Sequence, residues 1–133
     1  MPAIDIELVC THQHLIDELG SAKRLNNVLP VELGGDTTSI REAALEDVLI
    51  ALGRRRPPVH ATDLVHPEEL RRAVLYQTLE RLFGAAQHLD EGAWGAQRTR
   101  YEKRLRAELQ GLAPTIRDGM RAPSGIGIAV FRR

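Results

Sequence analysis

The central pattern of this chain is HPEELRRAVLYQTLERLFGAA, residues 66–86. Pro67 suits the first position of a helix, and Glu68 and Glu69 suit the positive end of the helix dipole. The apolar residues that follow cover well over half of the helical circumference: Leu70, Val74, Leu75, Leu79, Leu82, Phe83 and Ala86. A helix with so wide an apolar surface needs neighbours on several sides. We therefore predict a central helix that ends between Gly84 and Leu89.

A second helix is predicted downstream, from about Trp94 to Leu112. The intervening HLDEGAWG is a short turn, so the two helices should form an antiparallel αα-hairpin. Gly111 and Pro114 should stop the second arm of this hairpin. A narrow apolar stripe is expected to face the first arm: Trp94, Tyr101, Leu105, Leu109 and Leu112.

Upstream, a helix is predicted to begin near Ser39. Ser39 and Glu42 match the S-x-x-E capping box, in which each side chain satisfies a free backbone N–H. Gly53 is expected just after the helix, and the following RRRPP places arginines near the negative helix end before two prolines forbid continuation. The predicted apolar face is Ile40, Ala44, Leu45, Val48, Leu49 and Leu52.

The first 37 residues give a weaker pattern. Residues 3–10 alternate partly between apolar and acidic residues, which fits either a strand or the lead into a short helix. That short helix would run from His12 to Leu19 and end at Gly20. Residues 20–38 mix glycine and proline with apolar residues, so we predict an ordered loop laid on the core.

The chain closes with TIRDGMRAPSGIGIAVFRR, residues 115–133. Extended segments are expected around Thr115–Arg117 and Ile126–Phe131, because the DG and PSG between them are turn signals. They would form a hairpin or a two-stranded arm, whose free edge can add to a partner's sheet. The predicted fold is therefore mainly α: a helical bundle around an αα-hairpin (residues 1–114) with an extended C-terminal arm (residues 115–133).

The totals are those of one ordinary globular domain. The chain has 133 residues, a formal net charge of zero and one cysteine. Zero net charge gives no global attraction to nucleic acid or membranes, and a single cysteine excludes an internal disulfide framework. No apolar run approaches the ~20 residues of a membrane span, and the N-terminus lacks the basic region of a secretory signal. We therefore expect a reducing compartment, the cytoplasm or a particle assembled there.

The strongest metal-ligand pattern is CTHQH, residues 10–14. On a strand, Cys10, His12 and His14 would point the same way and could bind a metal ion, which makes a metal-dependent enzyme one hypothesis. The pattern lacks a fourth ligand, so ordinary polar residues before a helix are the simpler reading. The sequence contains no Gly-x-Ser-x-Gly elbow and no glycine loop in the context that binds phosphate. We predict no enzyme, no metal and no cofactor.

Arginine clusters are the more informative polar feature. RRRPP (residues 54–58) and RTRYEKRLR (residues 98–106) can face phosphates, and this supports a small helical nucleic-acid-binding regulator as an alternative function. The structural explanation is a helix end for the first cluster and a solvated helix face with Glu102–Arg106 pairing for the second. Aromatic residues make up only 4% of the chain, which disfavours a base-stacking surface.

Taken in order, these segments resemble a known family. SIREAALEDVLIALGRRRPP resembles the alanine-rich helix, arginine and proline segment of tailed-phage head–tail adaptor proteins, also called connector or neck proteins. HPEELRRAVLYQTLERLF followed by WGAQRTRYEKRLRAEL resembles their central helical hairpin, and the DG turn with a final strand is similar as well. The resemblance covers roughly residues 38–133.

The resemblance implies a structural virion protein without catalytic activity. Such subunits form a ring, typically of twelve, beneath the portal in the neck of a particle assembled in the host cytoplasm. The ring extends the DNA channel without sequence-specific DNA binding or membrane contact, and it links the capsid to stopper or tail-completion proteins. The resemblance also implies that the terminal segment contacts the portal or a neighbouring subunit. The residues expected there are Ile126, Ile128, Val130, Phe131, Arg132 and Arg133; those expected at subunit interfaces or the channel wall are Arg54, Arg55, Arg56, Arg100, Lys103 and Arg104.

Overall fold

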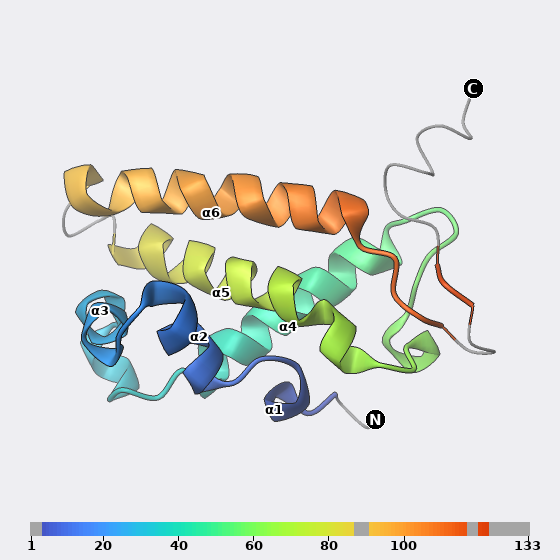
Figure 1. Cartoon of the computed structure of the whole chain (residues 1–133), viewed down its shortest axis with the longest axis horizontal. Helices are drawn as coiled ribbons and strands as arrows, with labels where there is room; N and C mark the ends of the chain where they lie inside the picture. Colours follow the sequence, from blue (N-terminus) through green and yellow to red (C-terminus); the bar gives the residue numbers. More distant parts are fainter. Residues whose placement is uncertain (1–3, 87–90, 117–119, 123–133) are drawn as a thin grey trace.

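The helix expected at the centre of the molecule lies there. A computed structural model describes residues 4–86, 91–116 and 120–122. Helix α5 (Arg71–Ala86) lies side by side with α6 (Glu91–Gly111) and is crossed by α4 (Thr38–Gly53) (Figure 1). The core gathers around α5, whose fully buried residues include Leu79 and Leu82. The chain is mainly helical, as the sequence pattern predicted.

Helices α5 and α6 form the predicted antiparallel hairpin. Residues late in α5 contact residues early in α6, and earlier residues of α5 contact later ones: the Phe83 and Trp94 ring centroids are 5.7 Å apart, and those of Tyr76 and Tyr101 are 6.1 Å apart. Pro67 begins a 3-10 turn, η3 (Pro67–Leu70), which continues directly into α5. This is the entry that the fixed backbone angle of proline favours.

The start and end of α4 differ from the prediction. The helix begins at Thr38, and the Asp36 carboxylate accepts hydrogen bonds from the Thr38 backbone N–H at 2.9 Å and from its hydroxyl at 2.7 Å. The predicted Ser39 capping box is therefore wrong, because a carboxylate three residues earlier already satisfies the helix start. Gly53 is the last residue of α4 rather than the residue after it.

The N-terminal segment is more helical than predicted. In place of a strand, residues 6–9 form the short helix α1 (Ile6–Val9), capped by Asp5. Helix α2 (His12–Leu19) has the predicted bounds and ends at Gly20, whose φ of 92° is easy only for glycine. The predicted loop contains α3 (Ala22–Val28) and the 3-10 turn η1 (Val31–Leu33). The prediction overlooked the Ser21 hydroxyl, which accepts from the Arg24 N–H at 3.2 Å and caps α3.

A buried arginine joins these N-terminal helices to α4. Arg41 is 3% exposed, and its guanidinium donates to the Thr37 hydroxyl at 2.9 Å and the Cys10 carbonyl at 2.8 Å. It also forms an ion pair with Glu7 at 2.9 Å. A buried charge is tolerated only when it is paired and hydrogen-bonded, so this network fixes how α1 sits on α4.

The described part of the C-terminal segment packs onto the helical body. Ile116 forms an antiparallel bridge with Leu64, which follows the 3-10 turn η2 (Ala61–Asp63), and Thr115 forms one with Arg121. The Glu69 carboxylate accepts from the Thr115 backbone N–H at 2.8 Å and from its hydroxyl at 3.0 Å. The predicted strand Ile126–Phe131 lies outside the described residues. No helix in the described part of the chain is long and apolar enough to cross a bilayer.

Candidate functional site

The arginines of RRRPP do not act alike. Arg54 and Arg56 are exposed. Arg55 is half-buried, and its guanidinium donates to the Leu112 carbonyl at 2.6 Å and to the Leu109 carbonyl. Burial lowers the pKa of Arg55 from its usual value. Arg55 therefore satisfies free carbonyls at the C-terminal end of α6, and only its two neighbours present their side chains to solvent.

The basic residues of α6 also divide. Arg104 forms an ion pair with Glu18 of α2 at 3.0 Å and lies over the Tyr101 ring at 5.4 Å. Arg100 lies 6.0 Å from the centroid of the same ring and is exposed, as is Lys103. The predicted solvated face therefore holds Lys103, whereas Arg100 and Arg104 lie around Tyr101 at the contact with α2.

The hypothesis of a Cys10–His12–His14 metal site is wrong in geometry. The two histidines open α2 instead of lining a strand. The His12 Nδ1 lies 2.9 Å from the Thr37 hydroxyl, and the His14 Nδ1 accepts from the Thr11 N–H at 2.9 Å. Burial raises the pKa of the Cys10 thiol to about 11. Within the described ranges, no group of three or more His, Cys, Asp or Glu residues is placed to hold a metal ion.

The proposed docking residues of the terminal segment have no structural placement. Ile126, Ile128, Val130, Phe131, Arg132 and Arg133 all lie outside the described residues. The segment that leads to them is described up to Ala122, whose N–H donates to the Pro114 carbonyl at 2.9 Å. The base of the terminal segment therefore starts beside the C-terminal end of α6.

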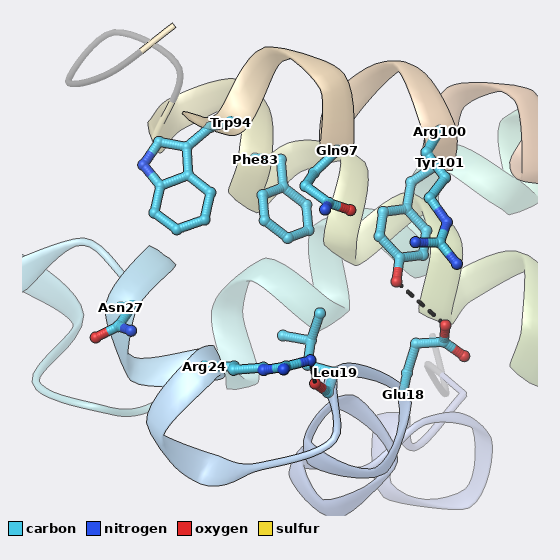
Figure 2. A pocket seen from close by; sticks show the side chains of 9 residues that line it. All are labelled: Glu18, Leu19, Arg24, Asn27, Phe83, Trp94, Gln97, Arg100 and Tyr101. Carbon is cyan, nitrogen blue, oxygen red and sulfur yellow. Dashed lines mark hydrogen bonds between the residues drawn. The ribbon is translucent and has the colours of Figure 1, made fainter. Parts of the chain in front are cut away.

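A cavity of about 540 Å³ opens at the other end of the hairpin. Figure 2 shows side chains of α5 and α6 on one side of it, and of α2 and α3 with the turn between them on the other. The Phe83 ring stacks on Tyr101 at 5.7 Å with an interplanar angle of 2°. The side chains that line the cavity are Glu18, Leu19, Arg24, Asn27, Phe83, Trp94, Gln97, Arg100 and Tyr101.

A hydrogen bond between α6 and α2 crosses this cavity. The Tyr101 hydroxyl donates to the Glu18 carboxylate at 3.1 Å, drawn as a dashed line in Figure 2. Burial, followed by the Glu18 charge, raises the pKa of Tyr101 to about 12. Tyr101 is therefore a neutral donor at physiological pH, and Glu18 is already engaged by Tyr101 and Arg104.

Sequence reasoning identified only part of this cavity. Trp94 and Tyr101 were placed on an apolar stripe, which is correct for their packing but gave no sign of an opening. Arg24 and Asn27 were missed because their segment was predicted to be a loop. The apolar pair Leu25 and Val28, three residues apart and buried, was the available signal for α3.

Comparisons with protein-family models, curated proteins and solved structures found no match.

Proposed function

We propose that this protein is a structural subunit of the head–tail adaptor type, which forms a ring beneath a phage portal and carries no catalytic activity. The ring would extend the DNA channel and link the capsid to stopper or tail proteins. The support from sequence is the order of segments, an alanine-rich helix with arginines and prolines followed by a helical hairpin and a final apolar segment. Its partners would be the portal, a stopper or tail-completion protein, and further copies of itself.

One structural observation carries this proposal. The base of the terminal segment is anchored at one end of the hairpin, by Glu69 to Thr115 and by the backbone bridge between Leu64 and Ile116. Arg121 adds an ion pair with Glu69 at 3.8 Å. The base is therefore held against the helical body, and the apolar residues after Ser124 follow it in the sequence. A segment of that kind suits strand addition to a partner's sheet, since backbone hydrogen bonds supply affinity.

The test is co-sedimentation with the cognate portal. The full chain should join the portal as a ring, and a chain ending at Ser124 should not. Full-length Ile128→Asp/Val130→Asp should also fail, because charges replace the apolar anchors of the segment, whereas Arg132→Ala/Arg133→Ala should weaken binding less, because it removes only polar contacts. Binding by the shortened chain would remove the docking role of residues 125–133, and absence of portal binding by the full chain would overturn the adaptor proposal.

The nucleic-acid-binding regulator receives less support from the geometry. Two of the basic residues it would use, Arg55 and Arg104, donate to groups within the chain. An adaptor should bind free duplex weakly, because a channel lining must let DNA slide. A steep fall of duplex affinity with salt concentration would favour the regulator instead.

A further inference from the structure

The cavity beside the first half of α6 is lined by two arginine side chains that are available to a ligand. Arg24 and Arg100 are exposed, and within the described residues neither forms an ion pair with a carboxylate. Arg24 donates to the Leu19 carbonyl at 3.2 Å. Trp94 and Leu19 supply apolar surface in the same cavity (Figure 2). The ligand that fits this arrangement is an apolar side chain flanked by negative charge.

Helix α1 presents such a group on the surface of the same protein. Leu8 is 60% exposed, although its neighbours Ile6 and Val9 are buried in the core. Asp5 and Glu7 on either side of Ile6 are exposed and acidic. Asp5 caps α1 and one oxygen of Glu7 pairs with Arg41, so both carboxylates are held in place. We call Asp5, Glu7 and Leu8 the α1 knob.

One copy cannot place its own knob in its own cavity. Helix α1 packs against η3 at the beginning of α5, whereas the cavity includes Phe83 near the end of α5. The 13 residues from Leu70 to Phe83 correspond to roughly 20 Å along a helix. The Arg41 network fixes α1 on the body of the protein. The knob and the cavity are therefore complementary surfaces at separate places on the protein.

We propose that the α1 knob of one copy binds in the cavity of a second copy. Leu8 packs against Trp94 and Leu19, and the acidic residues of the knob lie next to Arg24 and Arg100. Since the two surfaces differ, the contact is heterologous, and repeating it builds either a closed ring or an open filament. That it closes into a ring rests on the proposed adaptor function; the contact itself does not.

Sedimentation velocity of the full chain over a wide range of concentration tests this contact. The wild-type chain should associate beyond its 14.8 kDa monomer. Leu8→Asp and Arg100→Glu should each weaken association by roughly tenfold or more, because the first replaces the apolar contact with Trp94 and Leu19 by a charge and the second places carboxylates together. Matched controls are Met120→Asp, at an apolar residue that is 65% exposed, and Arg106→Glu, at an exposed arginine of α6; both should associate as the wild type does.

A mixture of the two variants tests the heterologous geometry. Leu8→Asp keeps a working cavity and Arg100→Glu keeps a working knob, so an equimolar mixture has one functional contact per pair. The mixture should form heterodimers and nothing larger. A wild-type chain that stays monomeric, variants that associate like the wild type, or a mixture without heterodimers would each overturn the proposal.

The same proteins separate this proposal from the adaptor function. Wild-type chain that self-associates through the knob but never joins a portal would remove the adaptor function and leave the contact intact. If the wild-type chain joins a portal while Leu8→Asp and Arg100→Glu self-associate normally, the adaptor function stands and the contact between knob and cavity is removed.

Discussion

The two ends of α6 are built in contrasting ways. At the Gly111 end, Arg55 donates to carbonyls of Leu109 and Leu112, and Glu69 accepts from Thr115, so polar groups of the chain satisfy one another. At the Trp94 end, α6 stands apart from α2 and α3 across a cavity of about 540 Å³. There the Glu18 carboxylate of α2 accepts from the Tyr101 hydroxyl and pairs with Arg104 of α6, and the Phe83 ring of α5 stacks on Tyr101.

The difference shows what determines the role of an arginine. One arginine cluster of the sequence, residues 54–56, meets the Gly111 end, and the other, residues 98–106, lies in the middle of α6. Arg55 donates its hydrogen bonds to the free carbonyls of a helix end, because such carbonyls are strong acceptors that need a partner. Its guanidinium therefore serves the fold of the chain itself. Arg100 extends from the side of a helix toward an opening, where no described carboxylate pairs with it. A basic side chain is therefore left exposed only where the fold supplies no acceptor for it.

The largest expected effect is at the aromatic end. Phe83→Ala should destabilise the protein by about 3–5 kcal/mol, because Phe83 is 3% exposed and contacts both Trp94 and Tyr101. Chemical denaturation measures this free energy of unfolding. Ile50→Ala on α4, at an apolar residue that is 46% exposed, is the control and should cost less than about 1 kcal/mol. Equal losses in the two variants would mean that the aromatic contacts do not hold this end together.

A smaller loss is expected at the polar end. Arg55→Ala should destabilise the protein by about 2 kcal/mol, since carbonyls at the end of α6 lose a charged donor. Hydrogen exchange should also quicken around residues 109–116, where the C-terminal segment begins. Arg55→Lys should recover part of the stability, because an ammonium still donates but cannot match the fork of a guanidinium. Unchanged stability in Arg55→Ala would show that solvent satisfies these carbonyls equally well.

The contrast also explains what could be predicted from sequence. The helical hairpin followed from Leu79, Leu82, Trp94 and similar residues, because helical spacing of apolar residues reports directly on burial. The hydrogen bonds of Asp36 at the start of α4 and the capping of α3 by Ser21 were missed, since several nearby polar residues could serve and only packing selects one. The cavity was not predictable, because its walls come from segments far apart in the chain whose spacing depends on tertiary packing.

A pH titration tests the hydrogen bond that crosses the cavity. The pKa of Tyr101 is raised from 10.0 to about 12, mainly by burial and then by Glu18. The unfolded chain ionises this tyrosine above about pH 10, whereas the folded chain keeps it neutral. Its contribution to stability is therefore complete below pH 10 and is lost as the pH rises toward 12.

Tyrosinate absorbance of the wild type minus that of Tyr101→Phe isolates this titration. Glu18→Gln should lower the pKa of Tyr101 only in part, because burial is the largest cause of the shift. A titration at the ordinary tyrosine value in the folded wild type would show that water reaches the ring and that the aromatic end is more open than described.

The smallest effect on stability is expected for Arg54→Ala/Arg56→Ala. Both side chains are exposed, and the one described hydrogen bond between them and the rest of the chain is local, from Arg56 to the Arg55 carbonyl at 3.2 Å. Surface changes of this kind usually alter the free energy of unfolding by less than about 0.5 kcal/mol. Denaturation should therefore separate this double variant clearly from Arg55→Ala. If it unfolds as easily as Arg55→Ala, the three arginines act together in closing the end of α6, and none of them is left for a partner. If its stability is unchanged, any loss of portal binding or of duplex affinity in the double variant reports a contact made by those two side chains.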